Sequence, residues 1–540
     1  MRFASGIATV SMATGMPGSA KRHEYTISFS YMPRMKSFDV AIIGSGHNGL
    51  ACAALLAKAG LRVVVCERSD RLGGATVSDT DVWPGYTISA ASYVCSLLDP
   101  WLVKELDLTK HGYHAYRKDP ASFTPMRDGR SLLLGSDHAT NAQEISAFDP
   151  ADVAGFAAFE AEATRLGSLL FETFADEDPS FERFDAQTQA LLRGSAADLV
   201  EKFVKTPVLQ ATLATDGLIG TNRGPRDAGT GYILAHHYAG RALGAQGAWG
   251  FVRGGMGGVS AALASAARSF GAEILTDASV ARIVIRENRV QGVILENGRE
   301  IDARCVASNA HPRTTLLGLA AGAEMPSWLR DKIVLWRTTG ASLKLNLALG
   351  ELPNFTARPG SNMQAHHRAT IHVAPSLDYL QKAFEDGRTE GASPEPMLEC
   401  FMQTPTEPDL APPGKHILSI FAQYFPYDRD DRWSTDAREN ITKSIIETLA
   451  QYAPNIPSAI EAQQLLAPPD LESRFGLVGG NIFHGELLPG QIYENRFNLR
   501  TPIDGLYLCG SGTHPGGCVS GFPGRRAAQA IVNDLVTVTS

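Results

Sequence analysis

The clearest pattern of hydrophobic positions along this chain is a short apolar strand, a helix and a second strand near the N-terminus. Residues 38–43 (FDVAII) form a nearly continuous apolar run of strand length. Residues 50–59 (LACAALLAKA) are mostly small and helix-favouring, and Gly60 ends that run. Residues 61–66 (LRVVVC) are again typical of a strand. The pattern therefore predicts a strand–helix–strand unit.

Further segments have patterns regular enough to predict an element. Residues 153–174 have helical periodicity with interspersed acids, which indicates an amphipathic helix whose apolar face packs in the core. Residues 445–452 also predict a helix, which ends before Pro454. The runs 280–286 and 505–509 are typical of strands.

A glycine-rich motif joins the first strand to the helix. Gly44, Gly46 and Gly49 form a G-x-G-x-x-G, and the strand–turn–helix–strand context is the one that dinucleotide binding requires. Glycine lets the backbone approach a pyrophosphate, and the N-terminus of the helix offers it free N–H groups. Glu67 ends the second strand about 20 residues on, where an acid accepts hydrogen bonds from a ribose. Its charge disfavours a 2′-phosphate, so NADP is not expected here.

NAD and FAD are both ligands of such a unit. The pair Gly73-Gly74 follows Glu67 closely and allows a second close approach of the backbone. That suits FAD, whose flavin half extends beyond the pyrophosphate, although a glycine pair alone is more often a turn. After Glu67 the sequence contains no second strand–G-x-G-x-x-G–helix–strand unit, so no dedicated NAD(P)H domain is predicted.

Charge, apolar runs and missing motifs argue against several classes of protein. The chain has 540 residues, and its formal net charge of −8 argues against nucleic acid as the main partner. No apolar run approaches about 18 residues, so no transmembrane helix is expected, while peripheral membrane contact stays open. The seven cysteines contain no Cys-x-x-Cys pair, which argues against a dithiol redox motif or a zinc knuckle. No Gly-x-Ser-x-Gly is present, so hydrolysis has no support.

Residues 1–34 differ from the rest of the chain. They contain Arg2, Lys21 and Arg22, several hydroxyl residues, and no acid before Glu24. We expect a disordered leader, and a mitochondrial-type transit peptide is the alternative. The predicted location is cytoplasmic or peripheral to a membrane, or the mitochondrial matrix if the leader is a transit peptide.

Several motifs together resemble the phytoene dehydrogenase-related flavoproteins, a family that includes phytoene desaturases and retinol saturases within the wider glutathione-reductase-like FAD superfamily. The resemblance is carried by residues 39–75 and most specifically by residues 505–517 (GLYLCGSGTHPGG), and it extends over nearly the whole chain past Met35. The His47-Asn48 pair points to one branch of this family, because true phytoene desaturases usually have bulkier or Gly-rich residues there.

The resemblance implies a fold and a division into domains. The expected fold is α/β, with a Rossmann-like FAD-binding domain of glutathione-reductase type and an inserted α+β substrate domain. The FAD-binding domain is expected to be discontinuous, over residues 35–110, 245–315 and 475–540. Residues 111–244 and 316–474 are expected to form the substrate domain.

The resemblance also extends the set of cofactor-binding residues. By it, the backbone of Val280 should meet the adenine, and Gly517 should sit at the N-terminus of a helix over residues 519–536 that faces the isoalloxazine. A Gly517→Val side chain would then lower the flavin potential and leave the fold intact. Cys518 stands where the family is expected to have glycine. The predicted cofactor-binding residues are Gly44, Ser45, Gly46, His47, Asn48, Gly49, Glu67, Arg68, Gly73, Gly74, Ala75, Val280, Gly510, Gly517, Cys518 and Val519.

Histidines are the candidates for further chemistry. His484 and His514 lie in blocks that resemble the family, so each is either a catalytic residue near the flavin or a hydrogen-bonded structural histidine. The pairs His236-His237 and His366-His367 are adjacent, so their side chains diverge, and no metal site is predicted.

The resemblance implies an FAD-dependent oxidoreductase that exchanges a hydride between a small, largely apolar substrate and flavin N5, forming or reducing a C=C bond. Oxygen or a quinone would accept the electrons. One alternative is a flavin amine oxidase acting on a C–N bond, and another is a non-enzymatic protein that binds flavin and partners. The sequence leaves the substrate, the direction of the reaction and the oligomeric state open.

Overall fold

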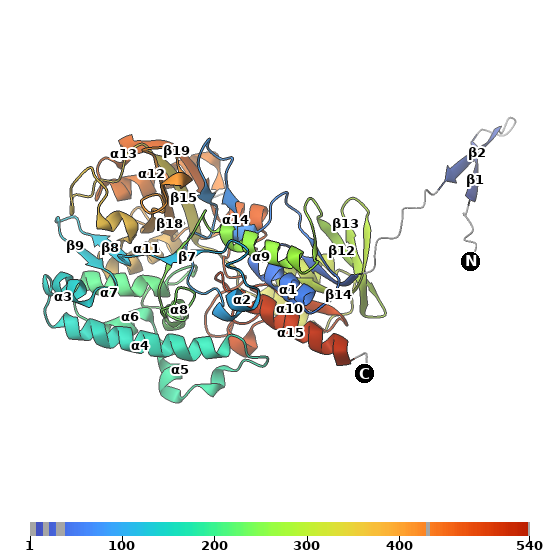
Figure 1. Ribbon diagram of the computed structural model, residues 1–540, viewed down its shortest axis with the longest axis horizontal. Coiled ribbons are helices and arrows are strands. Elements are labelled where there is room, and N and C mark those ends of the chain that lie inside the picture. The colour runs from blue at the N-terminus through green and yellow to red at the C-terminus, as the bar shows by residue number, and fades with distance from the viewer. Residues whose placement is uncertain (1–6, 15–20, 29–37, 428–432, 538–540) are drawn as a thin grey trace.

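The computed structural model describes residues 7–14, 21–28, 38–427 and 433–537. Two large sheets organise the molecule, each at the centre of its own lobe (Figure 1). Within residues 1–34, which the sequence predicts as a disordered leader, two strands pair in antiparallel fashion, β1 (Ile7–Thr14) and β2 (Lys21–Ser28). They pair with no other strand of the described chain.

The first sheet contains seven strands in the order β11-β4-β3-β14-β13-β12, with β20 beside β14. Strands β11, β4, β3, β14 and β20 run parallel, whereas β12, β13 and β14 form an antiparallel meander. The strands are β3 (Phe38–Ile43), β4 (Val63–Cys66), β11 (Glu273–Leu275), β12 (Val280–Arg286), β13 (Arg289–Leu295), β14 (Glu300–Ser308) and β20 (Leu506–Leu508).

Three helices pack beside this sheet although they are far apart in the sequence. Helix α1 (His47–Lys58) contacts both α9 (Gly257–Ser269) and α15 (Phe522–Thr537), so the blue helix α1 and the red helix α15 lie side by side in Figure 1. The alanines of α1 are completely buried or nearly so, which lets the neighbouring helices approach closely. This parallel sheet with packed helices confirms the predicted Rossmann-like fold class.

The second sheet also contains seven strands, in the order β19-β15-β18-β17-β16-β8-β9. All neighbouring pairs are antiparallel except β16 with β8. Its strands come from the segments predicted for the substrate domain. They are β8 (Ser122–Pro125), β9 (Ser131–Leu134), β15 (Ser342–Leu349), β16 (Thr370–Val373), β17 (Met397–Phe401), β18 (His416–Gln423) and β19 (Ile460–Leu466).

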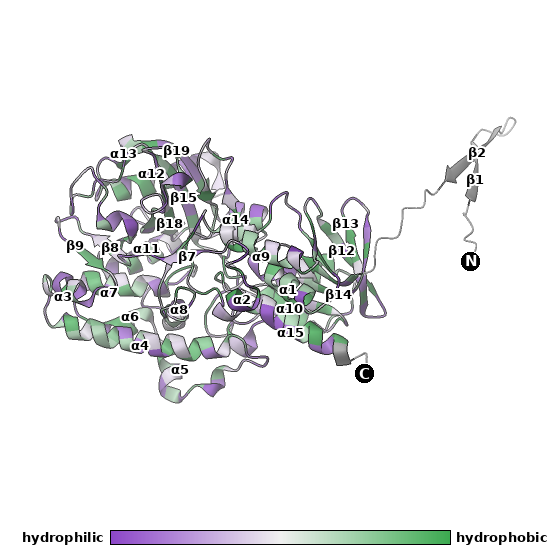
Figure 2. Cartoon of the chain, viewed as in Figure 1, coloured by the Kyte–Doolittle hydropathy of each residue, from purple (hydrophilic) through white to green (hydrophobic). Residues whose placement is uncertain are grey.

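Helices surround the second sheet. Helix α4 (Asp152–Thr173) is the amphipathic helix that the sequence predicts, and hydrophobic and hydrophilic residues alternate along it in Figure 2. The predicted helix at 445–452 overlaps the end of a longer one, α12 (Thr435–Ala450), which begins ten residues earlier and is capped by the Ser434 side chain. Helices α2 (Pro100–Glu105) and α10 (Ser327–Leu335) pack in the cores of the first lobe instead. The remaining helices of the described ranges are α3 (His138–Ser146), α5 (Ala186–Arg193), α6 (Ala196–Glu201), α7 (Pro207–Ala214), α8 (Thr230–His237), α11 (Leu377–Glu390), α13 (Ile456–Ala459) and α14 (Pro468–Phe475).

Short elements complete the chain between the sheets. The strand pairs are β5 (Ser78–Asp79) with β6 (Ile88–Ser89), and β7 (Ala115–Arg117) with β10 (Gly250–Val252). Within the described residues, no helix is both long and apolar enough to cross a lipid bilayer.

Candidate cofactor and substrate site

A cavity of about 890 Å³ is lined by residues of both lobes. That volume lies within the range of small-molecule and cofactor sites. One part of the lining, which we call the loop wall, is formed by Gly44 and residues 46–48, 66–71 and 73–77 of the first lobe together with α14. Another part of the lining, which we call the sheet wall, includes Tyr93, Ile219, Trp249, Lys344, Phe421 and Ile482.

The turn between β3 and α1 shapes the centre of the loop wall. Gly44 has a φ of +88°, a left-handed conformation that favours glycine. Gly46 precedes the helix, and no side chain caps the first turn of α1. The free N–H groups of this first turn and the positive end of the helix dipole therefore suit a phosphate. Gly49 has another role, because a Cβ there would lie 2.3 Å from the carbonyl oxygen of Gly44.

Most of the predicted cofactor-binding residues line this cavity, and so does one predicted catalytic residue. Those in the wall are Gly44, Gly46, His47, Asn48, Glu67, Arg68, Gly73, Gly74, Ala75, Val280, His484, Cys518 and Val519. Those outside it are Ser45, Gly49, Gly510, Gly517 and His514. Ser45, Gly49 and Gly510 instead support the wall from behind: Gly510, for example, packs so closely that a Cβ would lie 2.6 Å from the Asn309 carbonyl oxygen.

The Glu67 carboxylate holds the glycine turn by hydrogen bonds, and Glu67 also lines the cavity. Its Oε2 accepts hydrogen bonds from the backbone N–H and the hydroxyl of Ser45, both at 2.7 Å. Its Oε1 accepts one from the Ser69 N–H at 2.9 Å. A carboxylate has about four acceptor positions, so one is left for a ribose hydroxyl.

Replacing Glu67 by alanine is expected to weaken FAD binding about tenfold to about 100-fold, since each hydrogen bond to a charged acceptor is worth about 1.5–3 kcal/mol. FAD titration of the apoprotein measures this. Ser45→Ala is the matched control, because it removes the hydroxyl bonds with Glu67 and Gly73 but leaves the Glu67 carboxylate and its free acceptor position in place. Equal losses in both variants would mean that Glu67 acts through the turn and not on the cofactor.

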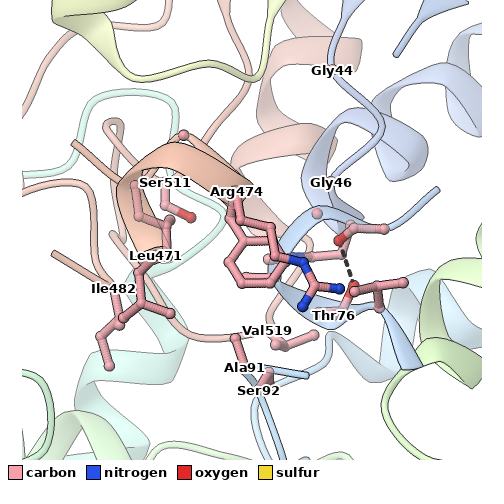
Figure 3. A pocket seen from close by; sticks show the side chains of 18 of the residues that line it. Gly44, Gly46, Thr76, Ala91, Ser92, Leu471, Arg474, Ile482, Ser511 and Val519 are labelled. Atoms are coloured by element: carbon pink, nitrogen blue, oxygen red, sulfur yellow. Dashed lines mark hydrogen bonds between the residues drawn. The ribbon is translucent and has the colours of Figure 1, made fainter. Parts of the chain in front are cut away.

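Helix α14 contributes one arginine to the loop wall, Arg474, which was not predicted from the sequence. Arg474 extends toward Gly46 and Thr76 in Figure 3, and its guanidinium donates to Asp79 Oδ1 at 2.6 Å. Arg68, in turn, donates to the carbonyl oxygens of Ser473 and Arg474. These contacts tie the loop after β4 to the second lobe, so both lobes enclose the cavity.

His514, predicted as either a catalytic or a structural histidine, is not among the residues that line the cavity. It is buried, with Nε2 3.0 Å from the carbonyl oxygen of Thr173, and its ring lies 4.8 Å from that of Tyr493. Its environment is that of a structural histidine. His484 does line the cavity, but burial lowers its pKa to about 4, as it does for His47. Both rings are therefore neutral at physiological pH.

The C-terminal helix also begins later than predicted. It starts at Phe522, since Gly521 has a φ of +82° and Pro523 occupies the first turn. Cys518 and Val519 reach the cavity from the loop before the helix. Gly517 faces Phe483 instead, at a distance that leaves no room for a Cβ.

Cys518 adopts a φ of +74°, which explains why glycine is expected at this position. Burial raises the pKa of its thiol to about 12, so no thiolate is present. Cys518→Gly is expected to raise the free energy of unfolding by roughly 0.5–1 kcal/mol, the relief of strain less the entropy of glycine. Urea unfolding of FAD-loaded protein measures this. Cys518→Ala keeps the Cβ and should gain nothing, and an equal gain in that control would disprove backbone strain as the cause.

The sheet wall is mostly apolar or aromatic, and Lys344 is the cationic side chain among its members. Lys344 of β15 is 3 % exposed, and its Nζ donates to the carbonyl oxygen of Ser89 and lies 5.3 Å from the Tyr93 ring centre. Burial lowers the pKa of Lys344 to about 7. Lys344 was not predicted from the sequence, although the alternation of polar residues and leucine in β15 was a signal for it.

No metal centre is evident at the site or elsewhere in the described ranges, since no three His, Cys, Asp or Glu side chains gather there as ligands. The adjacent histidines make other contacts. His237 Nδ1 lies 2.8 Å from the carbonyl oxygen of Ile233, and His367 Nε2 lies 2.9 Å from that of Pro353.

The fold and the cavity define a flavoprotein with a Rossmann-type cofactor domain, and comparison with known proteins agrees. The family described as flavin containing amine oxidoreductase matches residues 49–532. Pyridine nucleotide-disulfide oxidoreductase domain-containing protein 2 of Mus musculus is 38% identical, over 92% of this chain and 94% of its own. The lycopene-forming phytoene desaturase of Pseudescherichia vulneris is 28% identical, over 92% and 99%. A solved oxidoreductase from Methanosarcina mazei has a TM-score of 0.60 at 17% identity, over 92% and 100%.

The chain therefore belongs to the flavin containing amine oxidoreductase family. It is an FAD-dependent oxidoreductase, which confirms the predicted cofactor, the predicted enzyme class and the predicted resemblance. The uncapped first turn of α1 and the free acceptor position on Glu67 fit the pyrophosphate and ribose of FAD.

Proposed function

We propose that this FAD-dependent oxidoreductase dehydrogenates a small, largely apolar substrate, forming a C=C bond or reducing one in the reverse direction. The observation that carries the proposal is the composition of the sheet wall. Of the six side chains that define this wall, five are apolar or aromatic and the sixth is Lys344. Apolar surface of this kind favours a hydrophobic ligand by about 25 cal/mol per Å² removed from water. The likeness to a phytoene desaturase over nearly the whole chain supports the same substrate class.

The chain's own residues would bind FAD along the loop wall and hold the substrate against the sheet wall. When bound, FAD supplies hydride acceptance from carbon and passes the two electrons on to an acceptor such as oxygen or a quinone. The substrate also loses a proton from the adjacent carbon, and the electron pair of that C–H bond becomes the new C=C bond. Lys344 Nζ is suited to receive this proton, because an amine with a pKa near the working pH is an efficient base.

The test is an anaerobic screen of the FAD-loaded protein. Lipophilic polyenes and their dihydro forms are mixed with it, and loss of the visible flavin absorbance identifies a substrate. Mass spectrometry then shows whether the product has lost two hydrogens. Bleaching by none of the apolar compounds would overturn the proposal.

Amine oxidation is the second candidate, because the matching family is described by that activity. The same screen separates the two reactions. Oxidation of a C–N bond gives an imine, which hydrolyses to a carbonyl compound, whereas dehydrogenation between carbons keeps every heavy atom of the substrate.

A further inference from the structure

A buried cation, Arg496, lies behind the wall of the cavity. Arg496 directly follows the short helical turn Tyr493–Asn495, and its side chain is 1 % exposed. Burial lowers its pKa to about 10, so the guanidinium keeps its charge at neutral pH. A charge removed from water is costly to the fold unless a counterion or hydrogen bonds compensate it. Arg496 is compensated by hydrogen bonds alone.

Four backbone carbonyl groups hold the guanidinium, and we call them the carbonyl cage. Nη1 donates to the oxygens of Glu486 and Gln491 at 3.3 and 3.1 Å. Nη2 donates to those of Phe483 and Ser511 at 2.8 and 2.5 Å. The fifth N–H, on Nε, has no partner among the described residues. Carbonyl groups carry no net charge, so the carbonyl cage replaces water around the guanidinium without neutralising it.

No carboxylate of the described residues forms an ion pair with Arg496. Glu486 contributes only its carbonyl oxygen, because its carboxylate pairs with Arg337 at 2.6 Å. The charge of Arg496 acts instead on four buried or half-buried histidines, whose pKa values are lowered by burial and lowered further by this charge. They are His236, His311, His484 and His514. All four rings are therefore neutral, and the positive charge of Arg496 is not offset by them.

The carbonyl cage is part of the same chain segments as the cavity wall. Phe483 and Ser511, which supply two of the four carbonyl oxygens, both line the cavity, and so does His484. The guanidinium therefore lies directly behind this part of the lining. Its effect on the pKa of His484 is consistent with a field that reaches the cavity, although burial is the larger cause of that shift.

This part of the lining belongs to the flavin end of the site. The first turn of α1 suits the pyrophosphate, and Glu67 suits the ribose of the adenosine half. The flavin half extends from the pyrophosphate the other way, into the rest of the cavity. Asn48 of that first turn donates to the Ser511 hydroxyl at 3.1 Å, and Ile482 of the sheet wall directly precedes Phe483. The carbonyl cage thus lies where the glycine turn meets the sheet wall.

Reduction by a hydride brings two electrons and one proton to the flavin and leaves it as an anion. A fixed positive charge behind the wall stabilises that anion more than the uncharged oxidised ring. We propose that Arg496 tunes the bound flavin: its buried charge stabilises the anionic reduced form and thereby raises the reduction potential. The inference goes beyond the proposed function, because it holds for any substrate that reduces the flavin.

The reduction potential of the FAD-loaded protein, measured anaerobically against a reference dye, tests this. Arg496→Met and Arg496→Gln remove the charge, and the glutamine amide can still donate to two of the four carbonyl oxygens. In both, the equilibrium should shift toward oxidised flavin about tenfold to 100-fold, which lowers a two-electron potential by about 30–60 mV. Coulomb's law gives this order for unit charges roughly 6–12 Å apart at an effective dielectric constant near 20. Arg496→Lys keeps the charge and should keep most of the potential.

Arg526→Met is the matched control for the loss of a buried arginine. Arg526 is 6 % exposed and donates to the carbonyl oxygens of Asp176, Glu177 and His514. The negative charges of Asp176, Glu177 and Asp178 act on it, and it is not among the residues that line the cavity. This variant also loses three hydrogen bonds, but it should leave the flavin potential unchanged.

A measurement on the wild type keeps the test decisive if the neutral variants fail to hold FAD. The two-electron potential falls by about 30 mV per pH unit where reduction takes up one proton, and by about 60 mV where it takes up two. The pH at which the slope changes is the pKa of the reduced flavin, and a nearby positive charge lowers that pKa. We expect the change of slope about 1–2 pH units lower in the protein than in free FAD in the same buffer.

Three results would overturn the role of Arg496. One is an unchanged potential in FAD-loaded Arg496→Gln or Arg496→Met, even with weaker FAD binding, because the charge would then act on the pyrophosphate. Another is an equal fall in Arg526→Met, which would indicate a packing effect. The third is a change of slope at no lower pH than in free FAD. If the potential falls as expected but no apolar substrate reduces the flavin, the proposed function alone is overturned.

Discussion

Replacing Lys344 by methionine is expected to lower the turnover of a substrate about 10²–10⁴-fold, the usual contribution of a positioned acid or base. Lys344 lines the cavity, and burial lowers its pKa to about 7. Near neutral pH its Nζ can therefore receive the proton that the substrate releases. The rate of substrate-dependent flavin reduction in a stopped-flow instrument measures the effect.

The pH dependence of the wild-type reaction follows from the same pKa. A base acts in its neutral form, so the rate should rise as the pH increases through about 7 and then level off. Lys344→Met should lose this rise. Lys344→Arg is the matched control: it keeps a cation at the position but cannot give up its proton, so it should not restore turnover.

Lys344→Met should raise the free energy of unfolding, although it lowers turnover. An unfolded lysine has a pKa of about 10.4, whereas Lys344 in the fold has a pKa of about 7. The charged form is thus disfavoured in the fold, and the penalty is absent above about pH 10.4 and complete below about pH 7. Lys344→Met should therefore be more stable by about 1–4 kcal/mol at pH 6, with a smaller gain at pH 9. A variant that is inactive and also less stable would indicate a packing role instead.

Local patterns predicted the cofactor unit well. The apolar run of β3, the glycine turn and the acid after β4 are close in sequence, and each has a distinct physical requirement. The helix α4 and the strand β12 were also recognisable from their own periodicity. Residues 47–49 were expected only in the turn, but they form the first turn of α1, because a glycine turn runs directly into such a helix.

The sheet wall was not predictable in the same way. Lys344 and Phe421 are neighbours only because their strands pair in register, although they are far apart in the sequence. The alternation in β15 normally indicates a strand with one face in water. Here the polar face is buried against a cavity, and a pattern alone cannot separate these two situations.

Gly517→Val is expected to prevent the protein from folding into an FAD-loaded state, which reverses the expectation from sequence that only the flavin potential would change. A Cβ at Gly517 would lie 2.2 Å from Cδ1 and 2.5 Å from Cα of Phe483. The side chain of Phe483 is 2 % exposed, so the ring cannot move into solvent.

The backbone of Phe483 cannot give way either. Its N–H donates to Asn481 Oδ1 at 2.9 Å, and its carbonyl oxygen accepts from the buried guanidinium of Arg496 at 2.8 Å. The same guanidinium donates to the carbonyl oxygen of Ser511, so a shift of Phe483 would also disturb the wall of the cavity. We expect a loss of about 3 kcal/mol or more in the free energy of unfolding, since burial and backbone hydrogen bonds hold Phe483 in place against the added side chain.

The yield of FAD-loaded protein and its urea unfolding curve measure this loss. Gly318→Val is the matched control, because a Cβ at Gly318 meets nothing within 4 Å and the residue has no left-handed φ. That variant should retain its FAD with nearly the stability of the wild type. A Gly517→Val protein that holds its FAD with wild-type stability would show that Phe483 can move, and its flavin potential would then decide whether this turn acts on the cofactor.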